Sequence, residues 1–507
     1  MSTQDNTRVY DKEITDIAKG AGIVFLGTTI GTFLKYLFEL IVARNLGTEL
    51  FGLFFLGLAF LKVGEIISTL GLHRGVLRYI ALFRGEGDKR RTKGTIIFSL
   101  RIAIIVGIVI CISIIFLASF VSENIFKKAE LTPVLKMFAV IIPFTTLTTI
   151  LVFSTQGFKI MKYRVYVREI FEPTIRIIGV VVIFLLGYSL YGTIFVFNIS
   201  IVIGLFLAFF YLTKTFPDLI HKNIDSIFET KKILGFSWPL LLADFFGLIV
   251  IWMNILMIGY FKDSHEVGIY SAAHRTALLV QVILLSFNAI FSPIIADLYN
   301  KKESKKLERL FKIVTKWILS LSLPICLLTI LLAPEILSLF GKDFILGAAC
   351  LIILSLSQLV NSIFGSAGFL IMMAGKSRIN LFNNMTAATL NICLNLFLIP
   401  RYGITGAAIS LLITISVTNA LRFAEVFLLF KFHPFKSDFY KPLLAVGGSL
   451  ILTYLGKTYF VQLNNPLLKI FVLSAVFIVI YVLVLFMLGI EEEDKIVLNK
   501  IRAKFSI

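Results

Sequence analysis

The feature that most limits the fold of this chain is a series of long apolar runs separated by short basic connections. A helix needs about 20 mostly apolar residues to cross a membrane, whereas a transmembrane barrel gives weaker alternating segments of about ten. The pattern therefore predicts an all-α integral membrane protein with about 14 transmembrane helices. We place these spans near residues 20–43, 50–71, 94–120, 134–157, 168–188, 190–213, 233–260, 266–293, 308–333, 345–374, 379–400, 404–431, 438–457 and 466–489.

The chain carries a net charge of +19, and its Lys and Arg residues gather in alternate connections. The densest connection runs from His73 to Lys93 and holds seven of them. Cytoplasmic loops of membrane proteins carry this excess, so both termini are expected on the cytoplasmic side of a multi-pass cell membrane protein. Holding this topology and contacting anionic membrane lipids account for the basic charge, and no nucleic-acid partner is expected. Recruitment of an acidic partner is the alternative for the connection from His73 to Lys93.

The spacing of the spans repeats along the chain. Spans seven to twelve begin 211 to 216 residues after spans one to six. The segment Leu50–Phe54 resembles Glu266–Tyr270, and Gly192 corresponds to Gly406. Six is an even number, so the two copies enter the membrane from the same side as a parallel repeat. We predict a cytoplasmic tail at 1–19, six-helix lobes at 20–213 and 233–432, a cytoplasmic linker at 214–232, and helices 13 and 14 with a cytoplasmic tail at 433–507.

Ionisable residues deep in a membrane span are costly and usually functional. They occur in both predicted lobes, and a shared wet cavity is the simplest way to accommodate them. Their Lys and Arg side chains would suit a phosphate or pyrophosphate group. Structural ion pairs, such as Lys35–Glu39 and Glu172–Arg176, remain an open alternative. The expected substrate-binding residues are Lys35, Glu39, Lys62, Arg176 and Arg275, and the expected ion-coupling or orienting residues are Glu172, Asp244 and Glu425.

Other chemistries lack their signatures. Ala374–Ser377 resembles the end of a phosphate-binding loop, but Leu370 stands where that motif needs glycine. The outer connections are too short to hold a catalytic domain. The four cysteines lie in apolar runs without metal-binding spacing and are expected to be buried. We therefore expect no enzyme activity, catalytic residue, metal or cofactor. Pro173 and Pro239 lie inside spans and predict kinks.

Two stretches carry a resemblance to a known family. They are Lys35 to Phe54, which includes Glu39–Gly47, and Val267 to Arg275. With the spans and the repeat, they resemble the polysaccharide-biosynthesis (Wzx-type) flippases of the multidrug/oligosaccharidyl-lipid/polysaccharide exporter superfamily. The resemblance implies alternating access. In the related lipid II flippases, an acidic residue of span one and a basic residue of span eight line a cationic cavity, which implies this role for Glu39 and Arg275. The position beside that acid is basic in the family, but it holds Phe38 in this sequence. Lys35 lies one helical turn before Glu39.

The expected function is translocation of a polyprenyl-(pyro)phosphate-linked oligosaccharide across the cytoplasmic membrane. Glycan polymerases or glycosyltransferases are possible partners of such a protein. Two alternatives stay open. An ion-coupled multidrug or organic-cation antiporter of the same fold would depend on Glu39, Glu172 and Asp244, and a non-transporting scaffold of a glycan assembly complex would not need the charges in the spans.

Overall fold

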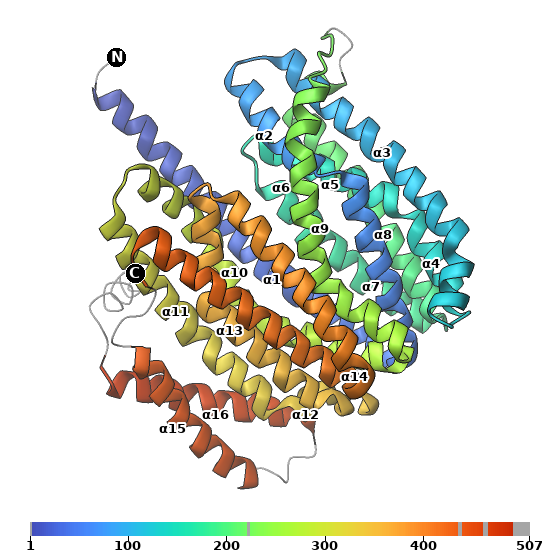
Figure 1. The fold of residues 1–507 in the computed structure, drawn as a ribbon, viewed down its shortest axis with the longest axis vertical. Helices are drawn as coiled ribbons and strands as arrows, with labels where there is room; N and C mark the ends of the chain where they lie inside the picture. Colours follow the sequence, from blue (N-terminus) through green and yellow to red (C-terminus); the bar gives the residue numbers. More distant parts are fainter. Residues whose placement is uncertain (1–2, 221–223, 434–438, 460–464, 490–507) are drawn as a thin grey trace. The chain divides into compact units, whose positions relative to one another are not determined.

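The computed structural model describes residues 3–220, 224–433, 439–459 and 465–489. All regular elements among these residues are helical, which confirms the predicted fold class (Figure 1). The first half of the chain forms α1 (Thr3–Thr69), α2 (Leu72–Gly85), α3 (Lys89–Phe120), the π-helix η1 (Val121–Ile125), α4 (Leu131–Val140), α5 (Ile142–Gly157), α6 (Lys162–Arg164), the π-helix η2 (Val165–Phe171), α7 (Glu172–Leu185), α8 (Leu190–Thr215), the 3-10 helix η3 (Pro217–Leu219) and α9 (Thr230–Phe261). The second half forms α10 (Ser264–Asn300), α11 (Ser304–Leu331), α12 (Ala333–Ser338), the 3-10 helix η4 (Lys342–Gly347), α13 (Ala348–Met373), α14 (Ser377–Phe430), α15 (Tyr440–Tyr459) and α16 (Pro466–Met487).

Ten helical stretches in the described part of the chain are long and apolar enough to cross a membrane. Two of them, Val24–Thr69 and Arg378–Phe430, have 46 and 53 residues, about twice the length of one span. Each breaks at a glycine with positive φ, Gly47 (φ 73°) in α1 and Gly403 (φ 56°) in α14. L-residues rarely adopt this conformation, so glycine lets each helix bend into two spans. Predicted span five corresponds to η2 with α7, and span thirteen corresponds to α15.

The basic connection after span two is a helix rather than a loop. Its apolar residues Leu72, Val76, Ile80 and Phe83 recur at helical spacing and are buried. They give α2 an amphipathic face that packs on α5, while α2 also contacts α9 (Figure 1). The high density of Arg and Lys in this segment hides that pattern in the sequence.

Two glycines one turn apart bring α1 against η2. A Cβ atom at Gly31 would lie 2.6 Å from the backbone oxygen of Glu169, and one at Gly27 would overlap Val165. Small residues at i and i+4 let helix backbones approach closely, which is a common mode of packing in membranes. Lys35 follows one turn later on the same face, so this contact places its ammonium beside η2.

The chain divides into two compact units, Met1–Ala272 with Leu381–Ser410, and Ala273–Asn380 with Leu411–Ile507. The predicted lobe boundaries rest on the sequence repeat and stay a prediction. The four cysteines are free; Cys326 and Cys350 are buried as expected, whereas Cys111 is half-buried and Cys393 is exposed. An apolar run does not show which face of a membrane helix packs against protein. The prediction that Cys393 is buried was therefore wrong.

In the first unit, a buried amide network joins α9, α10 and α14. Asn254 donates to the Tyr270 hydroxyl at 2.8 Å and accepts from Asn395 at 2.6 Å. Asn395 also donates to Asn391 at 3.1 Å, and Asn391 contacts Ser410. Hydrogen bonds between buried amide side chains are a common way to join helices in membranes.

In the second unit, α15 and α16 pack on each other and on α11 (Figure 1). Leu323, Phe477 and Tyr481 belong to one buried cluster, and the Tyr481 hydroxyl donates to the Ser320 carbonyl at 2.8 Å. Lys469 pairs with Glu335 at 3.0 Å, which ties α16 to α12. The last two spans are therefore packed parts of this unit.

We expect Gly31→Leu to lower the free energy of unfolding by about 1–3 kcal/mol, because the new side chain overlaps η2. Gly22→Leu is the matched control in the same helix, since a Cβ there meets nothing within 4 Å. Thermal unfolding of the detergent-purified variants measures both. Equal melting temperatures for the two variants would contradict the close packing of α1 on η2.

Candidate functional site

The first unit contains a buried row of alternating charges. Arg168, Glu172 and Arg176 follow at intervals of four residues and so share one helical face. Arg168 lies 3.3 Å and Arg176 lies 3.0 Å from the Glu172 carboxylate. Glu172 is 2% exposed, so its charge is shielded from solvent and held between two guanidinium groups. A carboxylate this deeply buried requires such partners.

The π-helix before α7 shapes this row. Pro173 lacks a backbone N–H, and its ring disturbs the preceding turn of an α-helix. The turn before Pro173 belongs to the π-helix η2, which is wider than an α-helix. It ends at Phe171, and α7 begins at the next residue. Insertions of this kind often occur at functional sites. At Pro173, where a kink was predicted, the helix therefore changes from π to α. At Pro239, the second predicted kink, α9 continues without a break.

Helix α1 continues the row with an acid and a base. Glu65 accepts from Lys62 and from Thr149, both at 2.8 Å, and lies 3.6 Å from Arg168. Arg168 also donates to Thr149 at 2.7 Å. The order Lys62, Glu65, Arg168, Glu172, Arg176 therefore alternates in sign across α1, η2 and α7. We call these five residues the charge row.

The far end of the charge row is fixed by α8. Arg176 donates to the Ser200 hydroxyl at 2.8 Å, and its guanidinium lies 3.9 Å from the centre of the Phe197 ring. A Cβ at Gly204 would lie 2.8 Å from Glu172 Oε1, so the absence of a side chain there makes room for the carboxylate. Arg176 is thus held by a hydrogen bond, an ion pair and a cation–π contact.

Charge balance leaves the row slightly positive. Three cations and two carboxylates give +1 when all five groups are ionised. The Lys62 side chain is 37% exposed, whereas those of Arg168 and Arg176 are 17% and 12% exposed. Lys62 is therefore the cation of the row most accessible to a ligand. The carboxylates hold the others in place.

A second pair lies beside the row. Lys35 donates to Glu169 at 2.5 Å, and the Lys35 side chain is 42% exposed. Glu39 is 9% exposed and lies within electrostatic range of Arg176. The structure therefore brings Lys35, Glu39, Lys62, Glu172 and Arg176 into one unit, as charged groups of two neighbouring elements, α1 and α7.

Arg168 was not among the site residues that the sequence predicted. Its position, four residues before Glu172, is the signal that would have found it, but it lies at the predicted end of span five and resembles a loop cation. Glu169, the next residue, was not predicted either, and it pairs with Lys35.

The remaining predicted residues lie elsewhere. Asp244 of α9 accepts from Arg74 at 2.5 Å and lies 3.4 Å from His73 Nε2, both on α2. Arg275 and Glu425 belong to the second unit, where both are half-buried. Their part in a cavity shared with the charge row therefore stays a proposal.

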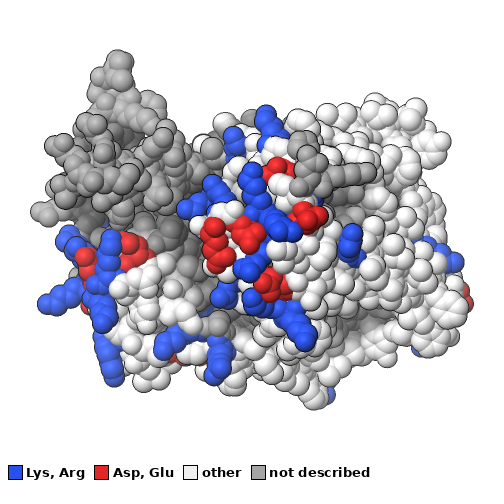
Figure 2. Space-filling model, turned by 90° about the horizontal axis from the view of Figure 1, so that it is seen from above, with Lys and Arg blue, Asp and Glu red and all other residues white. Residues whose placement is uncertain are grey.

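The connections predicted to face the cytoplasm carry many paired charges. Figure 2 shows Lys and Arg side chains gathered around carboxylates on one face, next to a largely uncharged surface. Ion pairs of these connections include Lys89–Asp218, Arg90–Asp225, Arg91–Glu229 and Lys232–Glu229. The linker residue Ile227 also donates its backbone N–H to the Arg90 carbonyl at 3.2 Å, which fastens the linker to α3.

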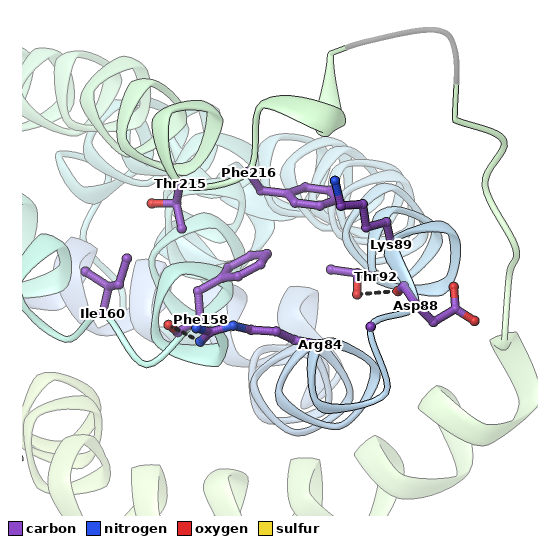
Figure 3. A pocket seen from close by; sticks show the side chains of 9 residues that line it. Arg84, Asp88, Lys89, Thr92, Phe158, Ile160, Thr215 and Phe216 are labelled. Atoms are coloured by element: carbon purple, nitrogen blue, oxygen red, sulfur yellow. Dashed lines mark hydrogen bonds between the residues drawn. The ribbon is translucent and has the colours of Figure 1, made fainter. Parts of the chain in front are cut away.

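A pocket of about 330 Å³ opens among these connections (Figure 3). Arg84 and Lys89 line the pocket. So do Phe158 and Phe216, whose stacked rings have their centres 5.4 Å apart. Arg84 donates to the Phe158 carbonyl, and Lys89 pairs with Asp218. Its cations already have partners, so the pocket does not offer a free anion site. Within the described residues, no three His, Cys, Asp or Glu side chains are grouped as metal ligands.

We expect Glu172→Ala to lower the free energy of unfolding by about 3–5 kcal/mol, because it leaves two buried guanidinium groups without their carboxylate. Asp297→Ala is the control, since its pair with Lys301 is half-exposed and is worth less than about 1 kcal/mol. Thermal unfolding compares the two. A loss for Glu172→Ala no larger than for Asp297→Ala would show that the row is not a buried network.

Comparison with solved structures places the fold. The structure superposes on a lipid II flippase MurJ in an inward closed conformation with a TM-score of 0.73, at 17% identity, over 91% of this chain and 98% of that one. It also matches an inward-facing multidrug resistance MATE family transporter with a TM-score of 0.65, at 16% identity, over 78% and 94% of the two chains. These likenesses establish a shared transporter fold.

Sequence comparison identifies the family. An uncharacterized membrane protein of Methanocaldococcus jannaschii is 23% identical over 95% of this chain and 98% of its own. A probable low-salt glycan biosynthesis flippase of Haloferax volcanii, Agl15, is 24% identical over 80% and 83%. The MatE family model matches residues 248–397, and the polysaccharide biosynthesis protein model matches residues 17–299, more than half of the chain. The resemblance of the two predicted stretches is thus confirmed, and the chain belongs to the polysaccharide biosynthesis protein family of the multidrug/oligosaccharidyl-lipid/polysaccharide exporter superfamily.

Proposed function

We propose that this protein translocates a polyprenyl-phosphate- or pyrophosphate-linked oligosaccharide across the cell membrane for glycan biosynthesis. The observation that carries the proposal is the charge row, in which buried carboxylates hold cations and leave the Lys62 ammonium accessible. The names of relatives that are flippases or capsular polysaccharide proteins support the same class of substrate. Both termini face the cytoplasm in this proposal.

The phosphate end of the substrate binds the exposed cations. Lys62 and Lys35 are the more accessible ammonium groups, and each is paired with a single carboxylate at its tip. Each ammonium has three N–H donors, so it can donate to a phosphate oxygen and keep its carboxylate partner. Arg275 contributes from the second repeat. Glu39 and Glu172 orient the cations, and Glu425 has an ion-coupling or orienting role.

Buried guanidinium groups set the charge around this site. Arg168 and Arg176 are less exposed than the two lysines and are held by several partners each. They act as fixed positive charges behind the lysines and raise the local affinity for an anion. The lipid tail stays in the hydrocarbon while the glycan passes between the lobes by alternating access.

The second candidate is an ion-coupled antiporter of organic cations. The match of residues 248–397 to the MatE model favours it. In that function Asp244, Glu39 or Glu172 would bind the cation. Arginines hold Asp244 and Glu172 in this structure, and Glu39 lies within electrostatic range of Arg176. A site whose carboxylates are occupied by fixed cations favours an anionic substrate.

We expect Lys62→Ala to reduce flipping of a lipid-linked oligosaccharide by about ten- to a hundredfold, because one charged hydrogen bond to phosphate is worth about 1.5–3 kcal/mol. Arg275→Ala is expected to act in the same direction. Reconstituted proteoliposomes with a fluorescent lipid-linked oligosaccharide and an outer-leaflet quencher measure the rate.

Lys62→Arg is the matched control, since it keeps the charge beside Glu65. We expect it to retain most of the rate. Wild-type flipping by both Lys62→Ala and Arg275→Ala would refute the cationic site. Efflux of a cationic dye by the same vesicles, lost in Asp244→Asn, would favour the antiporter instead.

A further inference from the structure

Helix α9 contacts the first repeat at both of its ends, and the two contacts differ in kind. One lies near Phe261 and the start of α10, at the predicted outer end. The other lies near Ser237, beside α2 and the predicted inner connections. All of these residues belong to the first compact unit.

The outer contact is a crossing of two backbones. Gly52 and Gly268 occupy equivalent positions 216 residues apart in the two repeats. A Cβ at Gly52 would overlap the Ser264 carbonyl oxygen, and a Cβ at Gly268 would overlap the Thr48 carbonyl oxygen. Thr48 and Ser264 are again 216 residues apart. Each repeat therefore places its glycine on the matching carbonyl of the other, so that backbone meets backbone at both points.

A lysine supports this crossing from the connection between η1 and α4. Lys128 donates to the carbonyls of Gly259 at 2.7 Å and Lys262 at 3.0 Å, at the end of α9. Cations favour the carbonyl ends of helices. Burial lowers the pKa of the Lys128 ammonium, and the nearby Asp263 carboxylate opposes that shift.

The inner contact depends on polar side chains. Asp244 of α9 pairs with Arg74 of α2 and lies 3.4 Å from His73 Nε2, and the His73 ring packs edge-on against Phe153. The Arg78 guanidinium lies 4.2 Å from the centre of the Phe236 ring. Arg74 is 44% exposed, so water already reaches the edge of this contact.

The inner contact involves a helix that the second repeat does not match. The chain breaks at Leu70 and Gly71, both with positive φ, and α2 begins there as a separate helix. The equivalent stretch of the second repeat, about residues 288–301, continues α10 as far as Asn300. The two ends of α9 are therefore unequal, with a symmetric crossing at one and a polar contact to α2 at the other.

We infer that Asp244, together with Arg74 and His73, forms a latch that closes the inner end and opens as α9 and α10 turn about the Gly52–Gly268 crossing. Ion pairs with an exposed partner exchange readily for water. A crossing of two backbones at glycines permits rotation while the helices stay in contact. The inference rests on the alternating access of the proposed function and assigns Asp244 to the gate rather than to substrate.

The test follows a cysteine beneath the latch. Ser237 is fully buried against Gly71 and Gly75, so Ser237→Cys, in a protein whose four native cysteines are replaced by alanine, reports opening. A water-soluble maleimide labels the purified protein. We expect Asp244→Asn and Arg74→Ala each to raise the labelling rate at least tenfold, because the latch spends more time open.

Asp244→Glu is the conservative control and keeps labelling slow. Ser99→Cys, at a buried position of α3, should stay unlabelled in every background and so excludes general unfolding. Equal labelling of Ser237→Cys with and without the Asp244→Asn substitution would overturn the latch. Labelling needs no substrate, so it tests the latch separately from transport. The labelling result could refute the latch while a flipping assay establishes transport of lipid-linked oligosaccharide, or support the latch while that assay refutes such transport.

Discussion

The ion pairs around Glu172 are the constraint on which the first unit depends. A charge inside a membrane span is costly unless another charge or a hydrogen bond satisfies it. Arg168 and Arg176 satisfy Glu172, and this requirement fixes the face that α7 turns toward α1 and α8. The Gly27–Gly31 contact and the space at Gly204 then follow as the packing that lets charged groups meet.

Much of this architecture could be read from the sequence because membrane spans leave a strong apolar signal. The helical class and the bends that divide two long helices agree with the predicted spans. Helix α2 was missed because its apolar spacing is embedded among basic residues. Sequence spacing shows which residues share a helical face, but it does not show which neighbouring helix that face meets.

The same limit explains the site. The Glu172–Arg176 pair lies on one helix, so its spacing predicted it, and the structure shows it at 3.0 Å. The Lys35–Glu169 pair joins residues 134 apart and needs the packing of α1 on η2, which no local pattern encodes. Asp244 was grouped with the cavity because of its depth alone, whereas α2, a helix that the spacing of the spans did not reveal, supplies its partners.

The odd number of charges in the row has an electrical consequence. Each uncompensated charge inside a membrane span has an energy in the transmembrane field, about 2.3 kcal/mol per 100 mV for a full crossing. A conformational change that carries the row through part of that field is therefore sensitive to voltage. In the proposed function, a phosphate bound at Lys62 adds negative charge to this cluster, so the loaded and empty forms would respond differently to the membrane potential.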